Sequence, residues 1–142
     1  MLLGFEHIGM TSGDLDRTIA FYCDLLELKL ILRKPQTSGE LAFLDAGGGM
    51  LEIIAPSQKT VARSRDVQSG EAGMRHLTLS YDDIDPIIER LVSAGTEIVE
   101  MPRLAYNGEV LKRVAFVRDP DGIIVELAER SLTWPGNSTA VA

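Results

Sequence analysis

Residues 4–22 read GFEHIGMTSGDLDRTIAFY, and residues 73–88 read GMRHLTLSYDDIDPII. Each stretch joins a short strand-like run containing one histidine to an amphipathic run that begins with acidic residues. His7 and His76 coincide at an offset of 69 residues, and so do the helix starts DLD at 14–16 and DID at 83–85. The two halves of the chain therefore begin with the same strand and helix.

The remainder of each half continues the match. Phe43 corresponds to Phe116 at an offset of 73, and Glu52 to Glu126 at an offset of 74, so we expect extra residues between the last two strands of the second half. Ser12 or Asp14 is the expected cap of the first helix, and Gly95 the expected end of the second. The patterns predict helices at 12–28 and 82–95, and strands at 4–10, 28–34, 39–46, 49–56, 73–81, 96–102, 111–119 and 122–130.

This order predicts an α+β fold made of tandem βαβββ modules. We expect a first module at 1–55, a linker at 56–73, a second module at 74–130 and a C-terminal tail at 131–142, which together form one structural domain.

The composition of the chain disfavours several classes of binding partner. The chain has 142 residues and a formal net charge of -7, which disfavours binding to nucleic acid or to an anionic membrane. Its single cysteine, Cys23, excludes a disulfide framework. The first ten residues contain no basic segment and no long apolar run, so we expect a cytoplasmic protein.

The repeated polar residues predict a metal site. Glu52 and Glu126 each interrupt an apolar strand at the equivalent place, and His7 and His76 do so in the first strand of each module. A buried carboxylate is costly unless a cation pairs with it. If the modules pack about a pseudo-twofold axis, two imidazoles and two carboxylates around one divalent cation give a neutral cluster. Ligands of nitrogen and oxygen without sulfur suit Zn²⁺, Ni²⁺, Co²⁺, Mn²⁺ or Fe²⁺.

The sequence resembles the vicinal oxygen chelate superfamily, which includes glyoxalase I, methylmalonyl-CoA epimerase, extradiol dioxygenases and antibiotic-resistance proteins. The resemblance covers about residues 4 to 130, and DPDG at 119–122 followed by Glu126 and Leu127 is its most specific motif. It implies modules that form a curved mixed sheet around the metal, a homodimer, and a small-molecule substrate with adjacent oxygens. The four ligand positions match His7, Glu52, His76 and Glu126, a set similar to that of bacterial glyoxalase I.

The same resemblance implies a lyase or isomerase that transfers a proton next to a carbonyl through a metal-stabilised enediolate. Glu126 is then the expected catalytic base, with Glu52 on the opposite face. Thr11 and Pro56 stand where glyoxalase I commonly has glutathione-binding arginine and asparagine, so the substrate stays open. The alternatives are an epimerase, an Fe²⁺ dioxygenase using His7, His76 and Glu126, and a metal-containing binding protein without catalysis.

Further polar residues are weaker candidates for contact with a substrate. The candidates for holding an anionic group of the substrate are Arg63, Arg65 and Arg75. The candidates for facing the cavity are Lys112 and Arg113, and those for lining its entrance are Tyr106 and Asn107.

Overall fold

The computed structural model describes residues 1–58 and 62–131. The chain divides into two compact units. Unit 1 contains the described residues of Met1–Ser64 together with Pro120–Gly122, and unit 2 contains Arg65–Asp119 together with the described residues from Ile123 onward. Each unit is described by itself.

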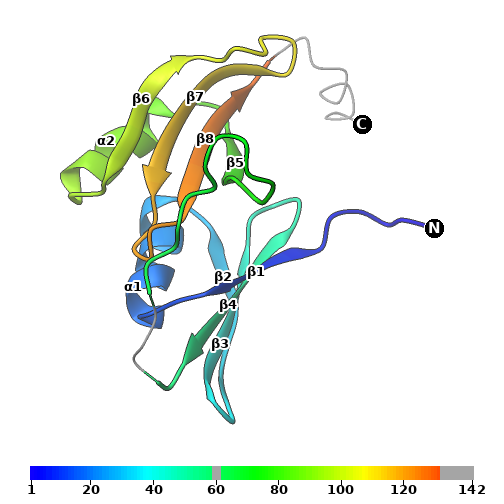
Figure 1. The fold of residues 1–142 in the computed structure, drawn as a ribbon, viewed down its shortest axis with the longest axis vertical. Coiled ribbons are helices and arrows are strands. Elements are labelled where there is room, and N and C mark those ends of the chain that lie inside the picture. Colours follow the sequence, from blue (N-terminus) through cyan, green and yellow to red (C-terminus); the bar gives the residue numbers. More distant parts are fainter. Residues whose placement is uncertain (59–61, 132–142) are drawn as a thin grey trace. The chain divides into compact units, whose positions relative to one another are not determined.

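Unit 1 is a four-stranded mixed sheet with one helical segment (Figure 1). Its strand order is β1-β4-β3-β2; β1 runs parallel to β4, and the other neighbours are antiparallel. The elements in chain order are β1 (His7–Thr11), α1 (Leu15–Ile19), η1 (Ala20–Leu25), β2 (Lys29–Gln36), β3 (Gly39–Asp45) and β4 (Met50–Pro56).

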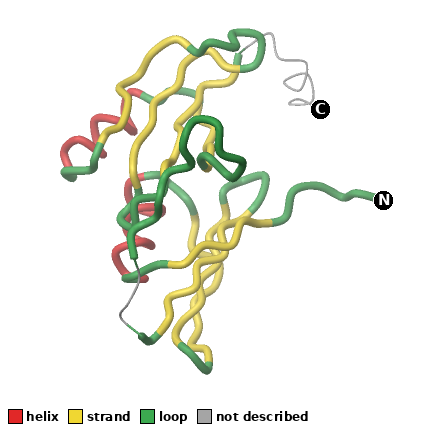
Figure 2. Tube along the Cα trace, in the orientation of Figure 1, coloured by secondary structure: helices red, strands yellow, loops and turns green. Residues whose placement is uncertain are grey.

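Unit 2 has the same plan, and Figure 2 shows strands forming most of the regular structure of both units. The strand order is β5-β8-β7-β6, again with one parallel pair, β5 with β8. Its elements are β5 (Leu77–Tyr81), α2 (Asp85–Ser93), β6 (Ile98–Leu104), β7 (Leu111–Arg118) and β8 (Ile124–Arg130). The predicted tandem βαβββ order is therefore confirmed. The tail from residue 132 and linker residues 59–61 lie outside the described residues.

One face of each sheet packs against its helix, because apolar side chains alternate along the central strands. On β4, Leu51 and Ile53 are buried, whereas Ile54, which points the other way, is exposed. We call the opposite side of each sheet the helix-free face; in unit 1 it carries Phe43 and Glu52, and in unit 2 Phe116 and Glu126. The buried residues on the helix sides are Leu15, Tyr22, Leu26, Ala42, Leu44, Leu51 and Ile53 in unit 1, and Ile84, Ile87, Ile88, Leu91, Ala115, Val117, Val125 and Leu127 in unit 2.

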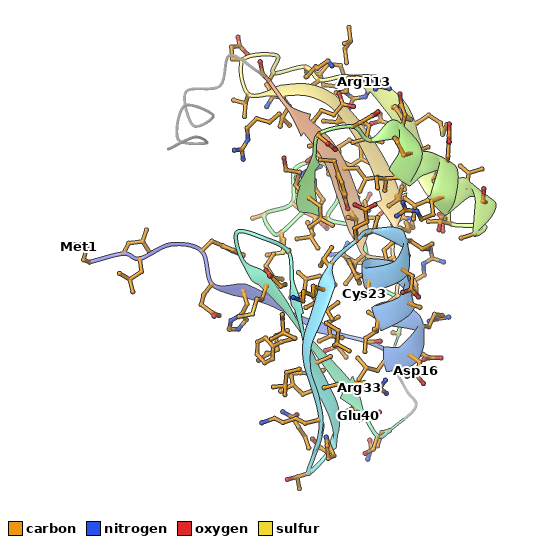
Figure 3. All side chains as sticks on the ribbon, turned by 180° about the vertical axis from the view of Figure 1, so that it is seen from behind. Met1, Asp16, Cys23, Arg33, Glu40 and Arg113 are labelled. Atoms are coloured by element: carbon orange, nitrogen blue, oxygen red, sulfur yellow. The ribbon has the colours of Figure 1, made fainter. Side chains whose placement is uncertain are left out.

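The first helical segment differs from the single helix expected. Asp14 caps α1 by accepting a hydrogen bond from the Arg17 backbone N–H, but the segment then widens into the π-helix η1. Phe21 and Tyr22 lie in this π-helical turn, both are buried, and their rings meet edge to face at 5.0 Å. Ion pairs from Arg33 on β2 to Asp16 on α1 and to Glu40 on β3 tie this segment to its sheet (Figure 3).

The length difference between the modules lies mainly in one loop. Six residues, 105–110, connect β6 to β7, whereas only two, 37–38, connect β2 to β3. The connection between the last two strands is only one residue longer in the second module, five against four. The expected position of the extra residues was therefore wrong for all but one of them. The four other residues extend the loop that contains Tyr106.

The DPDG motif forms a turn that is hydrogen-bonded to the start of the first helix. The Asp121 carboxylate accepts hydrogen bonds from the Gly13 backbone N–H at 3.0 Å and from the Thr18 hydroxyl at 3.2 Å. The backbone carbonyl of Asp121 accepts a further hydrogen bond from the Ser64 backbone N–H. Gly122 adopts a φ of +88°. The turn therefore fixes the start of the first helix from a distant part of the chain.

Candidate functional site

His7 and Glu52 lie on one face of the unit 1 sheet. In the pairing of β1 with β4, Glu52 is opposite Gly9, two residues beyond His7 and therefore on the same side of the strand. A Cβ at Gly9 would lie 3.5 Å from Oε1 of Glu52. The His7 ring meets the Phe43 ring edge to face at 5.8 Å, and Phe43 is opposite Glu52 in the pairing of β3 with β4.

His76 and Glu126 form the corresponding pair in unit 2. Nε2 of His76 lies 2.9 Å from Oε2 of Glu126. The His76 ring meets Phe116 edge to face at 5.5 Å, and Phe116 is opposite Glu126 in the pairing of β7 with β8. Each unit thus repeats one arrangement of histidine, phenylalanine and glutamate.

A threonine not singled out from the sequence completes the second pair. The Thr78 hydroxyl donates a hydrogen bond of 2.7 Å to Oε2 of Glu126. Thr78 is two residues after His76 and opposite Glu126 in the pairing of β5 with β8. The alternation of side chains along a strand would have indicated it. Gly9 is at the matching position in unit 1, so only unit 2 has this hydroxyl.

His7 has a different neighbour from His76. Its Nδ1 contacts the carboxylate of Glu6, an exposed residue that the sequence patterns did not single out. The hydrogen bond with Glu6 raises the pKa of His7, burial opposes this shift, and the charges of Glu6 and Glu52 raise the pKa further.

Neither site glutamate forms an ion pair with a lysine or arginine in the described part of the chain. Glu126 is 7% exposed, yet its contacts are with His76 and Thr78 rather than with a lysine or arginine. Glu129, three residues along β8 and on the helix side, is 3% exposed and pairs with Arg113 at 3.1 Å. Strand β8 therefore carries one buried glutamate paired with an arginine and one whose contacts are a histidine and a threonine.

The described residues contain no group of three or more histidine, cysteine, aspartate or glutamate side chains that could hold a metal by itself. Unit 1 brings together His7 and Glu52, and unit 2 brings together His76 and Glu126. Each unit therefore supplies half of the predicted ligand set.

A pocket of about 580 Å³ lies beside His76 in unit 2. Arg75 and Tyr106, two of the weaker candidates, line it, and so does Arg103, which the sequence patterns missed. Arg103 belongs to the end of β6, where a single arginine among apolar residues gives little signal.

The other weaker candidates have structural contacts. Arg113 does not face this pocket: it binds Asp85 of α2 at 2.7 Å and Glu129 at 3.1 Å, because its side chain points to the helix side of β7. Arg65 pairs with Glu71 at 3.2 Å. The Arg63 side chain packs against Gly122, and Asn107 lies in the turn before β7. Nζ of Lys112 lies 3.6 Å from Oε2 of Glu129.

Thr11 and Pro56 occupy the ends of strands in unit 1. Thr11 pairs with Ile54 at the end of β1, and Pro56 pairs with Gly39 at the end of β4. Neither side chain carries a charge. In the described part of the chain, no helix has the length and apolar character needed to cross a membrane.

Comparison with known proteins shows the family to which the chain belongs. The family model described as "Glyoxalase/Bleomycin resistance protein/Dioxygenase superfamily" matches residues 4–127. A probable lactoylglutathione lyase from Synechocystis is 31% identical over 125 residues, which cover 88% of this chain and 94% of that protein. The lactoylglutathione lyase GLX1 of Arabidopsis thaliana is 30% identical, and the match spans 91% of this chain and 45% of the plant protein.

Among solved structures, a mutant of glyoxalase I from Zea mays superposes with a TM-score of 0.75 at 25% identity, covering 90% of this chain and 46% of the maize chain. The chain thus spans about half the length of these plant proteins. With the family model matching nearly its whole described length, the chain belongs to the glyoxalase/bleomycin resistance protein/dioxygenase superfamily.

Proposed function

We propose that the protein is a metal-dependent lyase or isomerase of the glyoxalase I type, which transfers a proton next to a carbonyl group. The observation that carries the proposal is the repeated arrangement of histidine, phenylalanine and glutamate on the helix-free face of each sheet. The relatives named as lactoylglutathione lyases support the same reaction type.

The proposed metal ligands are His7, Glu52, His76 and Glu126, and their surroundings suit a cation. Glu126 is buried without a lysine or arginine partner among the described residues, so a bound cation would offset the cost of its burial. The 2.9 Å between Nε2 of His76 and Oε2 of Glu126 shows that unit 2 brings these two proposed ligand atoms side by side. Two imidazole nitrogens and two carboxylates accept Zn²⁺, Ni²⁺, Co²⁺, Mn²⁺ or Fe²⁺.

The residues would divide the proton transfer between them. A bound divalent metal would supply Lewis-acid stabilisation of negative charge on the substrate oxygens. Glu126 would accept the proton from the substrate carbon, and the Thr78 hydroxyl, by donating to Oε2, would orient that carboxylate. Glu52 would return or remove a proton on the opposite face of the substrate.

The remaining parts of the proposal concern partners. We expect a small-molecule substrate with adjacent oxygens, a homodimer, and a location in the cytoplasm. The homodimer is expected from the resemblance to the family, whose members commonly dimerise and in some cases share the site between subunits.

The test is proton exchange in heavy water. The protein is stripped of metal, reloaded with each candidate metal, and given the hemithioacetal of methylglyoxal and glutathione. The expected result is deuterium incorporation by the wild type that Glu126→Gln abolishes without unfolding the protein. Glu109→Gln, an exposed change in the loop before β7, is the control and should exchange normally. Exchange by E126Q at the wild-type rate would refute Glu126 as the base, and no exchange by the wild type with any metal would refute proton transfer on this hemithioacetal.

A further inference from the structure

The pocket beside His76 has one apolar side and one side with charged groups. Val99, Ile124 and the Phe116 ring contribute apolar surface, while Arg75 and Arg103 contribute guanidinium groups. A volume of about 580 Å³ lies within the range of pockets that hold small organic ligands. The pocket therefore suits a molecule with an apolar body and a polar end.

Arg103 is held in place before any ligand arrives. Its guanidinium stacks over the Tyr106 ring at 4.2 Å and lies 5.9 Å from the Phe116 ring. Glu100 accepts its Nε–H at 3.1 Å, and the carbonyl of Leu104 accepts one N–H of Nη1. A guanidinium has five N–H donors in a fixed plane, so these contacts fix its orientation and leave donors to face the pocket.

Arg75 gives the pocket its net charge. The lining includes two carboxylates, but Asp66 is neutralised by Arg118 through two hydrogen bonds of 2.7 and 2.8 Å, and Glu100 by Arg103 at 3.0 Å. Within the described residues, Arg75 has no ion pair. The pocket thus presents one uncompensated positive charge next to a candidate metal ligand.

We propose that this pocket recognises a carboxylate on the substrate, with Arg75 as the charge partner and Arg103 as a preorganised hydrogen-bond donor. A single uncompensated cation matches a monoanion, and the planar fork of arginine matches a carboxylate in two parallel hydrogen bonds. The apolar part of the substrate then lies against Val99, Ile124 and Phe116. This assignment rests on the proposed function, since it names the class of substrate that reaches His76 and Glu126.

The test compares two ligands that differ only in charge. Binding of 3-(benzylthio)propanoate and of its carboxamide to the full chain is measured by calorimetry, with and without added metal. The wild type is expected to bind the carboxylate at least about tenfold more tightly than the amide, because a charge-assisted hydrogen bond is stronger than a neutral one. Arg75→Gln should abolish this preference. Arg65→Gln, which removes an arginine paired with Glu71 outside the pocket, should leave it unchanged.

The outcomes separate this inference from the proposed reaction. Equal binding of both ligands by the wild type, binding of neither, or a preference that survives in R75Q would overturn the carboxylate pocket, whatever the result of the exchange experiment. A preference present in the wild type, lost in R75Q and kept in E126Q would support the pocket even if no proton exchange is found. Arg103→Lys keeps the charge but loses the planar fork, and it should weaken carboxylate binding without affecting the amide.

Discussion

The two buried glutamates of β8 allow structure and function to be separated by the same chemical change. Replacing Glu129 with glutamine removes the ion pair with Arg113 at 3.1 Å and the weaker one with Lys112 at 3.6 Å. Loss of one partner from a buried pair costs about 3–5 kcal/mol. We expect the lower end, about 3 kcal/mol, because Arg113 keeps its second partner, Asp85.

The same change at Glu126 should have little effect on stability. The amide oxygen of glutamine can still accept the hydrogen bond from Thr78, and no lysine or arginine in the described chain loses a partner. We therefore expect the free energy of unfolding of the metal-free protein to change by no more than about 1 kcal/mol.

Urea unfolding in the presence of a chelator measures both variants. The midpoint should fall clearly for E129Q and hardly for E126Q, with equal slopes. Proton exchange should show the reverse order, since E129Q acts from the helix side of the sheet and keeps the site. An E126Q variant as destabilised as E129Q would show that Glu126 is a structural carboxylate, and the reasoning would fail.

Three other predictions concern the frame around the site. Asp121→Ala removes the carboxylate that bonds to the first helix and should lower the free energy of unfolding by about 2 kcal/mol, measured by urea titration. Gly122→Ala places a side chain at a φ of +88° and should lower the free energy of unfolding by about 1–2 kcal/mol. Gly108→Ala, where a Cβ meets no neighbouring atom, should lower it by less than about 0.5 kcal/mol in the same assay. The hydrogen bond from Arg33 lowers the pKa of Glu40, so this pair stabilises the fold above the ordinary carboxyl pKa and loses its effect as the pH falls through the lowered value. The stability difference between wild type and Glu40→Gln should therefore shrink below about pH 4, and a difference that grows on acidification would contradict it.

Much of the fold could be predicted because the same pattern of strands and helix occurs in both halves of the sequence. One histidine in an apolar strand carries little information, but His7 and His76 at matched places in two modules gave the order of strands and helices. The matching of Phe43 with Phe116 also identified residues that the structure places opposite Glu52 and Glu126. Repetition reduced the ambiguity of each short pattern.

Features that depend on contacts distant in sequence were missed. Nothing near Asp121 indicates that its carboxylate bonds to Gly13 and Thr18, more than a hundred residues away. Lys112 and Arg113 were candidates for the cavity, but both lie within ion-pair distance of Glu129 on the helix side, and Arg113 also pairs with Asp85. The π-helical turn also escaped prediction, because Leu15, Tyr22 and Leu26 fit ordinary helical spacing equally well.

The most direct test of the central claim is the metal content of the purified protein. The four proposed ligands predict one divalent ion per chain by elemental analysis, whether one chain or two complete each site. His7→Ala and His76→Ala should each remove most of the metal while the protein remains folded by circular dichroism, and Glu109→Gln should keep it. Absence of metal after reloading, or retention by both histidine variants, would contradict the account.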